Sequence, residues 1–239
     1  MKTRLDQYLA VSGQVNSRSQ AESYIKLGQV SVNGQIVTKP GALVSAKDKI
    51  KLEASEQYVS RAGLKLASVA KALNISFKDK VVLDVGSSTG GFTDYALQNG
   101  AKKSIAVELG SDQMHPSLIN NPKIELHEKT DIITFQTDQT VDITVVDVSF
   151  ISLRIILPAV AKLSTKNTQI VAMVKPQFEA INSQIMHKGV IKNDKIRREI
   201  LKDFELWARQ YFVIKNKADS LVAGAKGNQE RFYLLSKIS

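Results

Sequence analysis

The first residues of the chain have apolar positions at helical spacing. In the first segment these positions are Leu5, Leu9 and Ala10. Ser17 followed by Gln20 has the form of a capping box, so a second helix is predicted to begin there. Gly28 is expected to end it, because glycine readily adopts the left-handed conformation that closes a helix.

An alternating pattern follows these two helices. Apolar and polar residues alternate on both sides of Asn33-Gly34, a pair that strongly favours a tight hairpin. One more short strand is predicted over 48–52. Two helices and a few strands in so few residues indicate a small α+β domain.

The polar stretch 53–60 separates this domain from a region with another pattern. Beyond it, helices are predicted near 61–73, 91–99, 152–163 and 194–209, and strands at 81–83, 104–107, 143–146, 169–174, 212–214 and 231–235. Such alternation predicts a mostly parallel sheet with helices on both faces. We expect an amino-terminal domain over 1–58, a linker over 59–63 and an α/β domain over 64–239.

The net charge of the chain indicates which class of molecule it binds. The chain has 239 residues with 33 Lys+Arg and 23 Asp+Glu, a formal net charge of +10. Residues 1–57 contain 8 Lys+Arg and 5 Asp+Glu, a net +3, and residues 58–239 contain 25 and 18, a net +7. A basic chain of this kind is expected to bind a polyanion, first of all nucleic acid. Because the excess is shared, both domains should touch it.

Membrane binding is the competing interpretation of a basic chain. The most apolar stretch, 151–163, contains Arg154, Pro158 and Lys162 and is shorter than the ~20 apolar residues of a spanning helix. The amino terminus lacks the apolar core of a secretory signal, so a cytoplasmic protein is expected. The absence of Cys excludes disulfides and cysteine nucleophiles, including the covalent route to carbon-five methylation of pyrimidines.

A glycine-rich loop follows the first predicted strand of the α/β domain, at the end where such sheets bind ligands. Gly86 and Gly90 are separated by three residues and preceded by Asp84, unlike the dinucleotide fingerprint G-x-G-x-x-G. This form is typical of S-adenosylmethionine enzymes, so that cofactor is predicted in place of a nicotinamide. The candidate cofactor-binding residues of the loop are Asp84, Gly86, Ser88, Gly90, Gly91, Phe92 and Thr93.

Three further carboxylates are candidate cofactor ligands. Glu108 ends the next strand, where a carboxylate accepts hydrogen bonds from both hydroxyls of a ribose; the alternative is a surface residue at a strand end. Asp131 is expected beyond the third strand, near the adenine, although an Asp in a turn needs no ligand. Asp147 ends the strand 143–146 and is expected at the same edge of the sheet.

Four polar residues are predicted to lie beside the cofactor, where they could take part in a reaction. Lys65 lies on the helix before the sheet, and Asp147 and Lys175 end two strands. Glu230 opens the last strand, which brings it to the same edge if that strand is antiparallel. A solvated surface charge is the alternative for any one lysine, but a position at this edge favours catalysis. The three histidines form no ligand pair, so no metal site is expected.

The first domain resembles the RNA-binding S4 domain over about residues 2–52. The segments that carry the resemblance are Arg4-Leu5-Asp6, Ser17-Arg18-Ser19-Gln20-Ala21, Gly28 to Gly34 and Asp48-Lys49-Ile50. The resemblance implies that the two helices present basic residues to the phosphates of structured RNA. The residues implied are Lys2, Arg4, Arg18 and Lys26. An ordinary solvated charge is the alternative for each.

Nearly the whole chain resembles the TlyA, or haemolysin A, group. Besides the S4-like domain, the resemblance rests on the segments 60–66, 84–93, 147–150, 174–179 and 224–230. These proteins are ribosomal RNA ribose 2′-O-methyltransferases with a catalytic domain similar to FtsJ. The resemblance implies a Rossmann-like class I methyltransferase fold, with a mostly parallel seven-stranded sheet whose last strand is antiparallel. It also implies S-adenosylmethionine as cofactor and a cytidine of ribosomal RNA as substrate.

The family's Lys-Asp-Lys-Glu tetrad is implied, residue by residue, at Lys65, Asp147, Lys175 and Glu230. Arg61, beside the linker, joins the expected RNA-binding residues. The segment 128–131 departs from the family pattern, which we expect to be more basic or to contain Asn there.

A ribose hydroxyl is a weaker acid than a lysine ammonium, so it must lose its proton as it attacks the methyl carbon. Neutral Lys175 is the expected base, oriented by Asp147, while Glu230 aligns Lys65 and the target hydroxyl. Methylation of an exocyclic amine is disfavoured, because the tetrapeptide 147–150 lacks the prolines typical of that reaction. The alternative functions are a non-catalytic RNA-binding or ribosome-assembly protein and a haemolysin acting on membranes.

Overall fold

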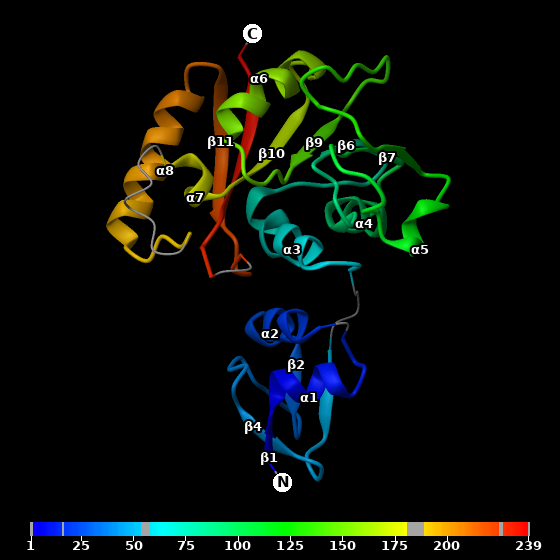
Figure 1. The fold of residues 1–239 in the computed structure, drawn as a ribbon, viewed down its shortest axis with the longest axis vertical. Coiled ribbons are helices and arrows are strands. Elements are labelled where there is room, and N and C mark those ends of the chain that lie inside the picture. Colours follow the sequence, from blue (N-terminus) through cyan, green and yellow to red (C-terminus); the bar gives the residue numbers. More distant parts are fainter. Residues whose placement is uncertain (1, 16, 54–57, 181–188, 225–226, 239) are drawn as a thin grey trace.

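The computed structural model describes residues 2–15, 17–53, 58–180, 189–224 and 227–238. The chain forms a small amino-terminal part and a larger α/β part (Figure 1). The elements of the small part are β1 (Lys2–Arg4), α1 (Leu5–Val11), α2 (Arg18–Lys26), β2 (Val30–Val32), β3 (Gln35–Ile36), β4 (Leu43–Ser45) and β5 (Ile50–Leu52). Residues 54–57 lie outside the described ranges, so the expected domain boundaries stay predictions.

Local sequence signals account for most of the small part. Ser17 Oγ accepts a hydrogen bond from the backbone N–H of Gln20 and caps α2, as predicted. Gly28 follows the helix with φ +70°, and Asn33 and Gly34 both have positive φ in the hairpin between β2 and β3. The antiparallel pair of β1 and β4 was not predicted, because strands of three residues carry almost no periodicity.

The larger part contains all the helices and strands predicted for it. Its elements are α3 (Arg61–Leu73), β6 (Val81–Val85), α4 (Gly91–Gln98), β7 (Lys103–Val107), α5 (Pro116–Ile119), β8 (Ile124–His127), β9 (Ile143–Val146), α6 (Leu153–Leu163), β10 (Gln169–Val174), α7 (Pro176–Glu179), α8 (Asp194–Ala208), β11 (Phe212–Asp219) and β12 (Arg231–Lys237). Four strands are longer than predicted: β7 begins at Lys103, and β6, β11 and β12 continue to Val85, Asp219 and Lys237. Within the described ranges, no helix has the length and apolar character that crossing a membrane requires.

The seven strands of the larger part form one sheet in the order β11-β12-β10-β9-β6-β7-β8. Strand β12 is antiparallel to both of its neighbours, and the other pairs are parallel. This confirms the Rossmann-like fold with a single antiparallel last strand. The strand order reverses between β6 and β9, and open α/β sheets bind ligands at the carboxyl ends of such a pair.

Successive side chains along a strand point to opposite faces of the sheet and pack into two different hydrophobic cores. On β10, Val171 and Met173 face the core under α3 and α4, whereas Ile170 and Val174 face the core under α6 and α8. All four side chains are almost completely buried. A sheet covered on both faces explains why its central strands are continuous apolar runs, and it leaves polar residues for the strand ends.

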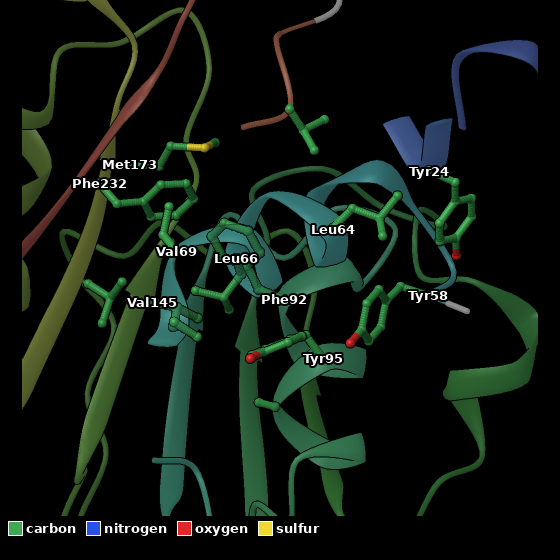
Figure 2. Close-up of a cluster of buried hydrophobic side chains, with 14 of the residues drawn as sticks. Tyr24, Tyr58, Leu64, Leu66, Val69, Phe92, Tyr95, Val145, Met173 and Phe232 are labelled. Carbon is green, nitrogen blue, oxygen red and sulfur yellow. The ribbon is translucent and has the colours of Figure 1, made fainter. Parts of the chain in front are cut away.

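The first core continues into the small part. Figure 2 shows Tyr24 of α2 beside Tyr58, which in turn lies against Tyr95 of α4. The ring centroids of Tyr58 and Tyr95 are 5.4 Å apart, and Gln20 Nε2 donates a hydrogen bond to the backbone oxygen of Tyr58. The small part therefore packs against the segment that leads into α3, directly before Lys65.

Candidate active site

The loop between β6 and α4 passes very close to its neighbours. Gly86 and Gly90 have φ +78° and +85°. A Cβ on Gly86 would lie 2.7 Å from the backbone oxygen of Asp147, and one on Gly90 would lie 2.5 Å from Met114 Sδ. Because neither position has room for a side chain, glycine at both allows the loop to follow the ends of the strands.

Asp84, at the end of β6, is completely buried. Its Oδ2 accepts hydrogen bonds from the backbone N–H of Thr93 at 2.9 Å and from Thr93 Oγ1 at 2.7 Å. Its Oδ1 has no hydrogen-bond partner in the part of the chain that the structure describes. Burial raises the pKa of Asp84 to about 7. Thr93 is also fully buried, so it acts on the site by holding this carboxyl group.

A cavity of about 390 Å³ opens along the carboxyl ends of β6, β7 and β9. Five of the expected cofactor-binding residues line it: Gly86, Ser88, Glu108, Asp131 and Asp147. Apolar side chains form much of the remaining wall, among them Leu109, Ile132, Ile133, Val148 and Ile156. An apolar slot with a few carboxylates fits a ligand that joins a flat base to a ribose.

Backbone N–H groups hold the carboxylates of Glu108 and Asp131 by hydrogen bonds. Glu108 Oε2 accepts a hydrogen bond from the Ser88 N–H at 2.9 Å, and its Oε1 accepts one from the Gly110 N–H at 2.7 Å. Asp131 Oδ1 accepts a hydrogen bond from the Ile133 N–H at 2.9 Å, which stabilises the turn itself. Each carboxylate oxygen has a second lone pair, so a ribose hydroxyl can still bind at Glu108.

A second cavity of about 130 Å³ adjoins the first, with which it shares Gly86, Ser88, Asp147 and Ser149. Its lining also includes Asp84, Ser87 and Phe92. Ser87 Oγ is buried and, like Asp84 Oδ1, has no hydrogen-bond partner among the described residues. These open acceptors suit the ammonium end of a ligand whose nucleoside end occupies the larger cavity. The residues present therefore fit S-adenosylmethionine.

Lys175, directly after β10, lines the smaller cavity and is almost fully buried. Its Nζ lies 2.6 Å from Asp147 Oδ1 and donates a hydrogen bond of 2.7 Å to Ser149 Oγ. Lys175 and Asp147 form an ion pair, and Ser149 Oγ is a second oxygen neighbour of the same nitrogen.

Lys65 and Glu230 form the second ion pair of the site. Lys65 lies on α3, and Glu230 lies immediately before β12. Lys65 Nζ is 2.6 Å from Glu230 Oε2. Their side chains are only 11% and 3% exposed. Strand pairing places Val174 opposite Arg231, so Lys175 and Glu230 extend the same two strands at one edge of the sheet. The structure therefore brings the four predicted catalytic residues together there as two lysine–carboxylate pairs.

Besides Ser87 of the cofactor loop, three residues at this edge were not predicted as part of the site: Ser149, Phe150 and Glu179. Phe150 is 91% exposed and has φ +65°, a conformation that is strained for an aromatic residue. It lines the larger cavity, and its ring lies 5.2 Å from that of Phe178. The only signal in the sequence was that these residues lie inside the family segments 147–150 and 174–179.

Glu179 connects the two loops that carry Asp147 and Lys175. Its Oε1 accepts a hydrogen bond from the Leu153 N–H and its Oε2 accepts one from Ser152 Oγ, both at 2.7 Å. Burial raises the pKa of Glu179. Because Ser152 and Leu153 begin α6, this carboxyl group fixes the β9–α6 loop against α7.

The expected RNA-binding residues fall into two groups. Arg4 and Arg18 both bind Asp6, with Nε–Oδ distances of 3.0 Å, and Asp6 is completely buried. Burial by itself raises the pKa of Asp6, but the bonds from both guanidinium groups outweigh it and hold that pKa below its usual value. The two arginines are therefore held side by side, while Lys2 and Lys26 are exposed.

Arg61 differs from the other expected RNA-binding residues. Its Nη2 donates a hydrogen bond to the backbone oxygen of Ala223, in the loop that leads to Glu230. The side chain is partly buried by this contact. Arg61 thus ties the first turn of α3 to the loop before β12, and its contact with RNA stays a prediction.

Comparison with known proteins agrees with this geometry. The FtsJ-like methyltransferase family matches residues 58–237, and the S4 domain family matches residues 3–50. The 23S rRNA (cytidine-2′-O)-methyltransferase TlyA of Campylobacter jejuni is 42% identical over 80% of this chain and 76% of its own. Hemolysin A of Brachyspira hyodysenteriae is 36% identical over 95% of this chain and 97% of its own.

A solved structure from Streptococcus thermophilus is 34% identical and superposes with a TM-score of 0.73. The superposition covers 100% of this chain and 89% of that one. The matched ranges, the single antiparallel strand and the cavity at the strand ends agree with one another. The chain therefore belongs to the FtsJ-like methyltransferase family, in the group of TlyA and hemolysin A proteins that carry an S4 domain at the amino end.

Proposed function

We propose that this protein transfers a methyl group from S-adenosylmethionine to the 2′-hydroxyl of a cytidine in ribosomal RNA. The observation that carries the proposal is the pair of buried lysine–carboxylate contacts beside the cofactor cavity, Lys175 with Asp147 and Lys65 with Glu230. The TlyA relative supplies the identity of the substrate. Ribosomal RNA as substrate also favours action in the cytoplasm.

Asp84, Ser87, Ser88 and Glu108 are the residues that would hold the cofactor, since they line the two cavities and offer acceptors for ammonium and ribose groups. When bound, S-adenosylmethionine supplies an electrophilic methyl group on a positively charged sulfur. The loop residues hold it beside Lys175, which lines the same small cavity. Asp84, Ser87 and Lys175 are buried, so the charges in this cavity are screened less than they would be in water.

Lys175 acts as the base in this proposal. Once it has lost its own proton, Nζ would accept the proton that the 2′-hydroxyl releases as the methyl group passes from the sulfur to the hydroxyl oxygen. Asp147, 2.6 Å away, then stabilises the ammonium group that forms. Transfer of that proton to solvent returns Lys175 to its neutral form.

Lys65 and Glu230 align the target ribose. The pair is held between α3 and β12, two elements whose positions are fixed by the core, so its charges cannot move away from the acceptor oxygen. The fixed ammonium group of Lys65 can stabilise negative charge that develops on the 2′-oxygen. A ribose acceptor also agrees with the absence of Cys from the chain.

The test is methyl transfer from labelled S-adenosylmethionine to ribosomal subunits and to free ribosomal RNA, with the modified ribose then mapped. Lys175→Ala and Asp147→Ala should each lower the rate by about 10²–10⁴-fold. Lys162→Ala serves as control, because Lys162 is an exposed lysine in the last turn of α6. Undiminished activity in both site variants would overturn the mechanism. RNA binding without cofactor binding would instead favour the non-catalytic alternative.

A further inference from the structure

Ser149 lies at this edge beside the proposed base, and the proposed mechanism gives it no role. It lines both cavities and is exposed, so it does not contribute to the core. Its Oγ nevertheless accepts a hydrogen bond of 2.7 Å from Lys175 Nζ. An exposed hydroxyl group that contacts a nearly buried lysine beside the reaction centre is a candidate for positioning that lysine.

A neutral amine has two N–H bonds and one lone pair, and a base must direct the lone pair at the proton it takes. Lys175 Nζ has two oxygen neighbours among the described residues, Asp147 Oδ1 at 2.6 Å and Ser149 Oγ at 2.7 Å. The carboxylate oxygen can only accept a hydrogen bond, and Ser149 Oγ accepts one from Nζ in this structure. The two N–H bonds therefore turn toward these oxygens.

The remaining direction at Nζ is left for the lone pair. Lys175 lines the small cavity, which is where the methyl acceptor must meet the cofactor. Asp147 alone does not fix this direction, because one N–H bond directed at its Oδ1 still leaves two positions at the nitrogen that the lone pair can occupy. A second contact, with Ser149 Oγ, leaves only one of them.

We propose that Ser149 is a positioning residue that holds one N–H of Lys175, so that the lone pair of the neutral amine faces the small cavity and the incoming 2′-hydroxyl. The inference rests on the proposed function and assigns to this site a residue outside its two lysine–carboxylate pairs. Lys175 remains the group that takes the proton, and Ser149 keeps its own hydroxyl proton throughout.

The experiment compares Ser149→Ala and Ser149→Thr with the wild-type protein in single-turnover methyl transfer to ribosomal RNA. Ser149→Ala should lower the rate at saturating RNA and cofactor by about 10- to 100-fold, because the base is misaligned. The KM for RNA and the Kd for S-adenosylmethionine should stay unchanged. Ser149→Thr keeps the hydroxyl group at an exposed position with room for a methyl group, and should recover most of the rate.

A second comparison separates positioning from a general structural role. In a Lys175→Ala background the base is already absent, so Ser149→Ala should cause no further loss. Ser111→Ala, at an exposed serine, is the control substitution and should leave the rate unchanged. An additional loss in the Lys175→Ala background, a Ser149→Thr protein as slow as Ser149→Ala, or a Ser149→Ala protein as fast as wild type would each overturn the inference.

The same measurements distinguish a failure of the proposed role of Ser149 from a failure of the proposed function. An active wild-type protein with an unaffected Ser149→Ala variant overturns the role of Ser149 alone. A wild-type protein that binds S-adenosylmethionine but transfers no methyl group to ribosomal RNA overturns the proposed function, and the role of Ser149 with it.

Discussion

Lys65 Nζ lies 2.6 Å from Glu230 Oε2, so the helix that follows the linker is joined by a nearly buried ion pair to the last strand of the sheet. Glu230 lies at the same edge of the sheet as Lys175, because Val174 pairs with Arg231. It also makes the position of α3 relevant to chemistry, because α3 carries one of the two lysines.

Substitutions of this pair should separate stability from activity. Lys65→Met or Glu230→Met alone leaves one buried charge without its partner, which should lower the free energy of unfolding by about 3–5 kcal/mol. The double variant removes both charges and should recover most of that stability, yet remain inactive. Denaturant unfolding and methyl transfer, measured on the same preparations, test this. A double variant with wild-type activity would exclude the pair from the reaction.

The start of α3 also contacts the cofactor loop. A Cβ on Gly63 would lie 2.6 Å from Tyr58 Cβ and 2.9 Å from the backbone oxygen of Gly91. Val59 N–H donates a hydrogen bond of 2.8 Å to Asp94 on α4. The segment between the domains thus lies against the first turn of α4, whose preceding loop lines the cavities.

Gly63→Ala should therefore weaken cofactor binding and lower turnover together, because the added methyl group displaces α3 or Gly91. We expect a lower affinity for S-adenosylmethionine by calorimetry, with RNA binding by the S4 domain retained. The matched control is Ala67→Gly, which alters the same helix away from the loop. Wild-type affinity and turnover in Gly63→Ala would show that the start of α3 does not influence the cofactor loop.

How far the site could be predicted depended on the kind of contact. Asp84, Asp147 and Lys175 are charged residues at the ends of apolar strands, and parallel topology alone brings strand ends to one edge. Glu230 needed one further condition, an antiparallel last strand, which the structure provides. Ser149 could not be predicted in this way, because its role depends on a distance of 2.7 Å between two loops.

Conversely, some predicted residues have contacts that residue type alone does not reveal. Arg61 carries a charge suited to RNA, but its guanidinium group binds a backbone oxygen of the loop before β12. Thr93 was expected to touch the cofactor, but it is enclosed by Asp84 and Ser104. The partner of Arg61 lies 162 residues away in the sequence, and those of Thr93 lie on β6 and β7, so residue type alone could not identify them.

The buried carboxyl group of Asp84 should make stability depend on pH. Its pKa is about 7 in the folded protein, against about 3.9 in the unfolded chain. Between these values the folded state holds a proton that the unfolded state has lost, so stability falls as pH rises, by up to about 1.4 kcal/mol per pH unit. Above pH 7 both states are ionised and the dependence from this group ends.

Asp84→Asn removes this titration and keeps an oxygen that can accept from Thr93. The free energy of unfolding of wild type relative to Asp84→Asn should therefore decrease from pH 5 to pH 7 and then level off. Asp138→Asn, at an exposed position, is the control and should show no such trend. A difference between wild type and Asp84→Asn that does not vary with pH would contradict the raised pKa.

Phe150, which lines the larger cavity, has a strained backbone conformation and an exposed side chain. A left-handed conformation costs a residue other than glycine about 1–2 kcal/mol, and a ring that is 91% exposed gains little from burial in return. Strain of this kind is retained at functional sites. An exposed aromatic ring beside a ribose-binding site can stack on the base of the target nucleotide, a contact worth about 1–3 kcal/mol.

Phe150→Gly should therefore raise or preserve the thermal midpoint, because glycine adopts this conformation without strain, and still reduce methyl transfer. Phe150→Ala keeps the strain and should be slow without the gain in stability. Phe150→Trp should retain activity, since a larger ring also stacks. The affinity for S-adenosylmethionine should be unchanged in all three variants, because the loss concerns RNA. A Phe150→Gly protein with wild-type turnover would show that the exposed ring has no part in holding the nucleotide.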